Sequence, residues 1–71
     1  MKIYIADDSP PVRSRLIKFL SEQRELEVVG QTGDAREALD AVRRLRPDVV
    51  ILAIHIHGGN GIDLLKAIHT T

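Results

Sequence analysis

The chain has 71 residues, with ten basic and ten acidic side chains, three histidines and no cysteine. This length allows one small domain, which buries only about 60% of the surface that its unfolded form exposes. The balanced charge excludes an overall field that attracts nucleic acid or membranes, and the absence of cysteine excludes a disulfide framework. Because 44% of the residues are hydrophobic, the composition argues against disorder.

The chain opens with a predicted strand over residues 1–6, an apolar run followed at once by Asp7 and Asp8. Ser9 then predicts a helix N-cap in front of Pro10, because proline is tolerated in a first turn whose amides have no helical partner. Apolar residues with helical spacing predict the buried stripe of this helix at Val12, Leu16, Phe19 and Leu20.

A short second strand is predicted over residues 26–29, and Gly30 is expected to end it. Asp34 with Glu37 three residues later resembles a capping box and predicts the start of a second helix, which Pro47 stops. The apolar residues of this helix predict a buried stripe at Ala35, Ala38, Leu39, Val42 and Leu45.

Residues 49–54 form a continuous apolar run rich in β-branched side chains, which predicts a strand buried on both faces of a parallel sheet. The glycine-rich residues 58–61 predict a turn, with Asn60 as a cap for a third helix that begins at about Gly61. That helix has Ile62, Leu65 and Ile68 on one face. Strands that alternate with helices are typical of an α/β fold with a parallel sheet.

Asp7 and Asp8 are the best candidates for a binding site. Two adjacent carboxylates where a strand meets a loop can hold a hard cation such as Mg²⁺. The simpler interpretation is that Asp8 or Ser9 only caps the following helix, where the helix dipole favours an acidic side chain. Both interpretations are open on the residues alone.

The acidic pair after the first strand, and the spacing from the apolar run 49–54 to Gly61, resemble the receiver domain of two-component response regulators. The resemblance implies a flavodoxin-like, three-layer fold with three helices and sheet order 2-1-3. It also implies Mg²⁺ as cofactor, held by Asp7, Asp8 and the backbone carbonyl of His55. The phosphoacceptor position is Ala53, and alanine cannot accept a phosphoryl group. Mg²⁺ binding is therefore expected to be weak or absent, since a third carboxylate is missing.

The resemblance covers residues 1–71 but only the N-terminal part of the family's domain, so we interpret the chain as one partial receiver domain. A fourth strand would normally cover the third, and its absence predicts an open apolar edge. We therefore expect a homodimer that completes the sheet through the third strands. Exchange of strands between copies is the second choice. The predicted interface comprises Val49, Ile51, Ile62, Leu65 and Ile68.

The leading functional hypothesis is a non-enzymatic, non-phosphorylatable receiver-like module that acts through protein–protein interaction. The alternative is a fragment of an ordinary phospho-accepting, DNA-binding response regulator into which Ala53 was introduced. A second alternative is a metal-binding protein that uses Asp7, Asp8, His55 and His57, because imidazole is a common ligand of transition metals. The partners are expected to be a second copy and a histidine kinase or other signalling protein. Direct contact of this segment with nucleic acid or membrane is not expected, and the predicted location is the cytoplasm.

Overall fold

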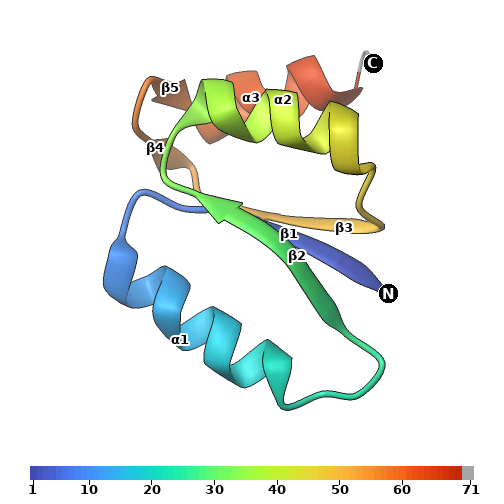
Figure 1. Ribbon diagram of the computed structural model, residues 1–71. Coiled ribbons are helices and arrows are strands. Elements are labelled where there is room, and N and C mark those ends of the chain that lie inside the picture. Colours follow the sequence, from blue (N-terminus) through green and yellow to red (C-terminus); the bar gives the residue numbers. More distant parts are fainter. Residues whose placement is uncertain (70–71) are drawn as a thin grey trace.

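A three-stranded parallel sheet lies between helices on both of its faces (Figure 1). The computed structural model describes residues 1–69. The main elements are β1 (Lys2–Ala6), α1 (Pro10–Ser21), β2 (Glu27–Thr32), α2 (Ala35–Leu45), β3 (Val49–Leu52) and α3 (Gly61–His69). A small antiparallel hairpin, β4 (His55–Ile56) and β5 (Gly59–Asn60), connects β3 to α3. The sheet order β2-β1-β3 and the three helices confirm the predicted fold.

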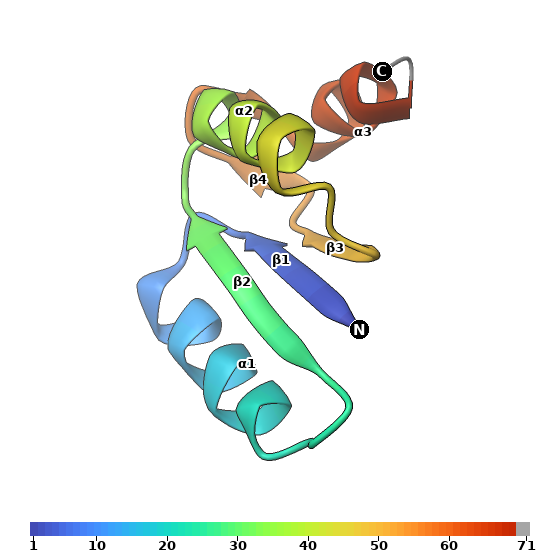
Figure 2. The same ribbon diagram turned by 45° about the vertical axis from the view of Figure 1, so that its right-hand side comes forward.

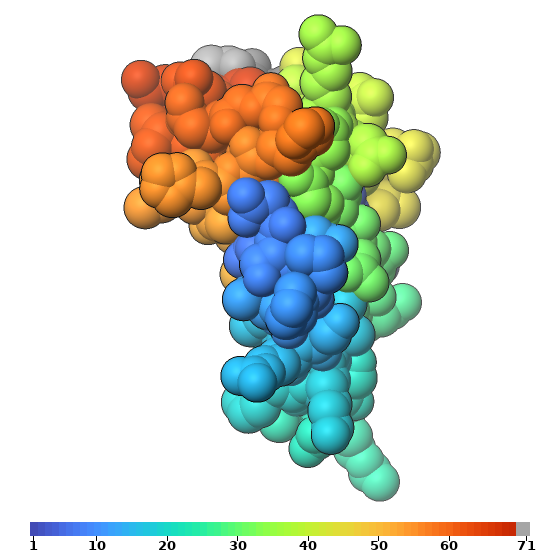
Figure 3. All heavy atoms as spheres, turned by 90° about the vertical axis from the view of Figure 1, so that its left-hand side faces the viewer, coloured from blue at the N-terminus to red at the C-terminus, as the bar shows by residue number. Residues whose placement is uncertain are grey.

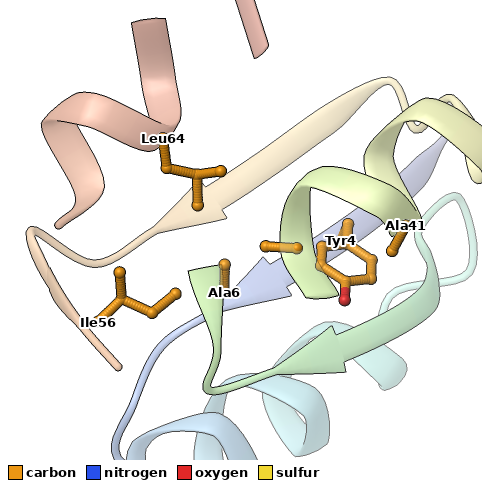
Figure 4. Close-up of a cluster of buried hydrophobic side chains, with 6 residues drawn as sticks. Tyr4, Ala6, Ala41, Ile56 and Leu64 are labelled. Carbon is orange, nitrogen blue, oxygen red and sulfur yellow. The ribbon is translucent and has the colours of Figure 1, made fainter. Parts of the chain in front are cut away.

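The central strand β1 separates two hydrophobic cores, because successive side chains of a strand point to opposite faces. Ile3 and Ile5 face α1 and pack with Leu20, whereas Tyr4 and Ala6 face α2 and α3. Figure 4 shows the second core, in which Tyr4, Ala6, Ala41, Ile56 and Leu64 lie together. All five residues of the predicted stripe of α2 pack against this core. One face of the sheet is therefore covered by α1, and the other by α2 and α3.

Strand β2 extends further than the sequence predicted, since it begins at Glu27 and continues through Gly30 to Thr32. The pairing of β1 with β2 shifts register between Ile3 and Tyr4, and Tyr4 then lies opposite Gly30. A Cβ atom at Gly30 would lie 2.8 Å from the Tyr4 ring. Gly30 therefore makes room for the Tyr4 ring on the face of the sheet that α2 covers, and the prediction that Gly30 ends the strand was wrong.

The predicted apolar stripe of α1 is partly wrong. Leu16 and Leu20 pack against the sheet as expected, together with Ile17, but Phe19 is 63% exposed and Val12 is 44% exposed. Helical spacing does not determine which side of an apolar stripe faces the sheet. α1 is rotated on the sheet so that Ile17 faces the core, whereas Val12 and Phe19 face solvent.

The predicted caps are confirmed. The Val12 amide donates to the Ser9 side chain, the Glu37 amide to Asp34, and the Asp63 amide to Asn60, at 3.5, 3.1 and 2.8 Å. At the other end of α2, Arg46 takes a left-handed conformation with φ 49°, and Pro47 follows. Strand β3 stops at Leu52, two residues before the predicted end. No helix within residues 1–69 is long and apolar enough to cross a membrane.

The stability of this fold should depend on pH through Tyr4. Burial raises the pKa of the Tyr4 hydroxyl, the Glu37 carboxylate adds to the rise, and Arg44 opposes it. The tyrosine of the unfolded chain ionises at about pH 10, so as pH rises the unfolded chain loses this proton before the folded chain does. The free energy of unfolding should therefore fall as pH rises above about 10 and stay unaffected by this group below about 9. Urea titrations at a series of alkaline pH values should show a smaller decline for Tyr4→Phe than for the unmodified chain.

Candidate functional site

The carboxyl ends of the parallel strands bring the acidic pair and Ala53 to one edge of the sheet. Ala6 pairs with Leu52 in the β1–β3 ladder, and the Ala53 amide donates to the Ala6 carbonyl at 2.9 Å. Asp7 follows Ala6 directly, so the backbone of Ala53 lies next to the backbone at the start of the acidic pair. Figure 3 views the molecule from this side, where the blue connection from β1 to α1 lies next to the orange hairpin segment.

The two acidic residues have different environments. Asp7 is half-buried, and one of its carboxylate oxygens accepts a hydrogen bond from the Ser9 amide at 2.8 Å. Its own amide donates to the Thr32 carbonyl at 3.0 Å. Asp8 is exposed, and its carboxylate accepts no hydrogen bond from any other residue within 1–69. Asp7 thus shapes the turn into α1, while Asp8 has its oxygens free for a ligand.

These donors suit a hard cation only in part. Mg²⁺ takes oxygen ligands, retains several waters and commonly uses one or two carboxylates, which Asp7 and Asp8 can supply. Ala53 contributes a methyl group where a further carboxylate would be needed. His55 begins β4 two residues later and pairs with Asn60. The residues therefore fit a largely hydrated Mg²⁺ ion and lack the ligands for a tightly held one.

The two loop histidines do not complete a transition-metal site. Among residues 1–69, no group of three or more His, Cys, Asp or Glu side chains is placed to hold a metal ion. His57 acts instead through its backbone, because its amide donates to the Gly33 carbonyl at 3.1 Å and its carbonyl accepts from the Ala35 amide at 2.8 Å. The described structure thus does not support the metal-binding alternative based on His55 and His57.

Residues 55–60 form a hairpin that is fastened to the start of α2, where the sequence predicted only a turn. Gly58 has a φ of 82°, a left-handed conformation that favours glycine, and the space beside it is filled by the Asp34 side chain. At the end of the hairpin, the Gly61 amide donates to the Ile54 carbonyl at 2.6 Å. The loop that follows Ala53 is therefore held to both α2 and the end of β3.

Thr32 connects the end of β2 to α2 beside this edge. Its buried hydroxyl donates to the Glu37 carboxylate at 2.5 Å and accepts from the Asp34 amide at 3.1 Å. The Thr32 carbonyl is the acceptor for Asp7 described above. One residue therefore ties together the acidic turn, the end of β2 and the first turn of α2.

Arg13 also belongs to this edge, although no sequence pattern singles it out. Its guanidinium donates from Nη1 to the Asp7 carbonyl and from Nε to the Gln31 side chain at 3.1 Å. In sequence it is one of several cations on an amphipathic helix. The available signal was its position one turn into the helix that begins at the sheet edge, from which a long side chain can reach back over the strand ends.

The chain is similar to known signalling proteins along nearly its whole length. A family model described as the response regulator receiver domain matches residues 3–71. A protein-glutamate methylesterase/protein-glutamine glutaminase of Rhizobium etli is 45% identical over 69 residues, which are 97% of this chain and 20% of that protein. The DNA-binding transcriptional activator DevR/DosR of Mycobacterium tuberculosis is 39% identical over 66 residues, 93% of this chain and 30% of that protein.

A solved structure shows the same architecture. The response regulator domain of Thermotoga maritima CheB superposes with a TM-score of 0.95 at 33% identity, over 99% of this chain and 52% of that one. The chain therefore spans about half of that domain, and between a fifth and a third of the two relatives in sequence.

Proposed function

Because the chain belongs to the response regulator receiver domain family of two-component signalling, we propose that it is a receiver-like module that does not accept a phosphoryl group. The observation that carries this proposal is the place of Ala53, paired to the end of β1 beside the acidic pair. A phosphoacceptor needs a nucleophilic oxygen there, and a methyl group has none. The module then acts through protein–protein contacts.

Receiver domains typically bind Mg²⁺ at the phosphorylation site. For this chain we propose weak binding by Asp7, Asp8 and the His55 carbonyl, with water completing the coordination. When bound, Mg²⁺ neutralises negative charge at the strand ends. The free carboxylate of Asp8 supports this assignment, and the hydrogen bond from the Ser9 amide to Asp7 limits the affinity.

The proposal predicts that acetyl phosphate leaves no acyl phosphate on the chain. Intact-mass spectrometry after treatment should show only the unmodified mass. In the Ala53→Asp variant, the added carboxylate should strengthen Mg²⁺ binding about tenfold, since it supplies a third charged oxygen ligand. Ala53→Asn is the matched control, because it has the same shape without the charge. A labelled unmodified chain, or equal Mg²⁺ affinity for both variants, would contradict the role given to position 53.

The alternative is that these residues belong to an ordinary DNA-binding response regulator in which Ala53 is an introduced substitution. The similarity to a DNA-binding transcriptional activator supports it, although the chain spans only 30% of that relative. The complete reading frame of the gene distinguishes the two, because the alternative requires an aspartate codon at position 53. Both versions propose a histidine kinase as partner and a cytoplasmic location.

An exposed apolar edge along β3 supports a protein–protein role. No strand within residues 1–69 pairs with the outer side of β3, which lies at the opposite edge of the sheet from β2 (Figure 2). A groove between β3 and α3 is lined by apolar residues, among them Ile62 and Leu65, which are 49% and 55% exposed. Apolar edges of this kind favour pairing with another chain.

The two edges of the sheet differ in how they resist such pairing. The β2 edge contains a register shift, an internal glycine and the exposed polar residues Glu27 and Gln31. The β3 edge has none of these, and its residues Val49, Val50, Ile51 and Leu52 are all apolar. We propose that a second copy of this chain covers the β3 edge, since an uncharged apolar edge is complementary to itself.

The structure changes which residues can serve this interface. Val49, Ile62 and Leu65 are exposed and stay in the proposal. Ile51 packs against the core beneath α1, and Ile68 packs against the core between the sheet and α2. Both already contribute to the fold of a single copy, so substituting either of them does not test the interface alone.

Light scattering of the 71-residue chain at micromolar concentration should give the mass of a dimer, and Ile62→Lys should shift it to a monomer. The lysine places an unpaired charge in an apolar contact. Val12→Lys is the matched control, because Val12 is similarly exposed but lies on α1, across the sheet. A folded monomer for the unmodified chain would overturn the proposed dimer.

A further inference from the structure

A half-buried arginine of α1, Arg13, contacts the backbone of the acidic pair. We propose that Arg13 is the positioning residue of the Asp7–Asp8 turn and that Gly33 provides the space for its guanidinium. The inference deepens the proposed function, and its cation-binding part rests on that function. The metal site predicted from the sequence does not include Arg13 or Gly33.

The Arg13 guanidinium reaches from α1 to two acceptors, of which one lies in the acidic turn and the other on β2. Nη1 donates to the Asp7 carbonyl, and Nε donates to the Gln31 side chain on β2 at 3.1 Å. Hydrogen bonds with a charged donor are stronger than neutral ones. Arg13 therefore bridges the end of β1 and the edge strand β2 across the carboxyl side of the sheet.

Gly33 lies directly beside this bridge. A Cβ atom at Gly33 would be 2.7 Å from Arg13 Nη1, and 3.4 Å from both the Asp7 carbonyl oxygen and the Asp8 Cα. The guanidinium and the backbone of both acidic residues thus converge on Gly33, which has no side chain. Even a methyl group there would push the guanidinium away, while the backbone neighbours stay at ordinary contact distance.

The bridge completes a clamp on the Asp7 residue. Its amide donates to Thr32, its carbonyl accepts from Arg13, and its carboxylate accepts from the Ser9 amide. In a site with a third carboxylate, a bound cation could itself draw the acidic turn into place. Here Ala53 supplies no carboxylate, so the orientation of the Asp8 side chain depends on the contacts that the protein itself makes to the turn.

Arginine suits this task better than lysine. Its planar group offers donors in a fixed arrangement, which matches two acceptors on different elements, whereas lysine carries a point charge on a flexible stem. Arg13→Lys therefore preserves the charge but loses the geometry. Gly33→Ala leaves Arg13 itself unchanged and displaces its guanidinium. The two variants disturb one contact by independent means.

Amide hydrogen exchange measured by NMR tests the clamp without any metal. In both Arg13→Lys and Gly33→Ala, the amides of Asp7 and Ser9 should exchange about tenfold faster, as expected for loss of a charge-assisted hydrogen bond. The Ile5 amide in the middle of β1 should keep its rate, which separates local loosening from global unfolding. Arg15→Lys, at an exposed site on the same helix, is the matched control and should change neither amide.

Titration with magnesium chloride, followed by the amide shifts of residues 7–9, then tests the link to the cation. The apparent Kd for Mg²⁺ should rise about threefold or more in both variants and stay unchanged in Arg15→Lys. Unchanged exchange at Asp7 and Ser9 in both variants would overturn the positioning role, and so would tighter Mg²⁺ binding in either. Faster exchange in a chain that shows no Mg²⁺ binding at all would uphold the clamp and refute the cation site of the proposed function.

Discussion

Replacement of Gly61 by alanine is expected to unfold the chain, or to lower its free energy of unfolding by about 3 kcal/mol or more. A Cβ atom at this position would lie 2.0 Å from the Ala53 carbonyl oxygen, 2.8 Å from the Ala53 carbonyl carbon and 2.9 Å from the Ile54 Cα. All three are backbone atoms, so no side chain can rotate to relieve the overlap. The start of α3 would have to move away from the end of β3.

Such a movement also breaks the hydrogen bond from the Gly61 amide to the Ile54 carbonyl. Gly61 is buried, and Leu64, one turn later on α3, belongs to the core beneath α2. A small domain has a narrow margin of stability, so a loss of this size removes a large part of it. The acidic edge would be disturbed as well, because the displaced backbone includes Ala53.

Urea denaturation followed by circular dichroism measures the effect. Gly59→Ala is the matched control, because a Cβ atom at Gly59 meets only the Ala35 side chain, at an ordinary 3.4 Å. It should leave the midpoint nearly unchanged. Equal midpoints for the two variants would show that Gly61 has room for a side chain beside Ala53 and Ile54.

Truncation of Ile5 to alanine is expected to cost about 2–5 kcal/mol of unfolding free energy. Among residues 1–69, Ile5 is the largest side chain that is fully buried, and it belongs to the core between the sheet and α1. Its removal leaves a cavity walled by Ile3 and Leu20, which the surrounding backbone of the sheet cannot collapse to fill.

Phe19→Ala is the control that distinguishes the structure from the sequence-based expectation. It removes a larger apolar side chain, but one that is 63% exposed, so its cost should stay within about 0.5 kcal/mol. If Phe19 were buried, as the predicted stripe of α1 implies, its truncation would lower the free energy of unfolding about as much as that of Ile5. Chemical denaturation of both variants decides which side of α1 faces the sheet.

The elements of this protein and their order could be predicted from the sequence because they depend on local patterns. Alternation of apolar runs with amphipathic segments identified three strands and three helices, and Ser9, Asp34 and Asn60 were found as caps. The meeting of the acidic pair with Ala53 also followed, given the family resemblance. Neighbouring parallel strands end at the same edge of a sheet, whatever the details of packing.

Only the tertiary structure decided the features that depend on how elements meet. The extent of β2 depends on the Tyr4 ring, which lies against Gly30 from the neighbouring strand, and the exposure of Phe19 depends on the rotation of α1. The clamp on Asp7 depends on Arg13 reaching from α1 across Gly33. Each is a contact between residues far apart in sequence or on different elements, where spacing along the chain carries no information about distance in space.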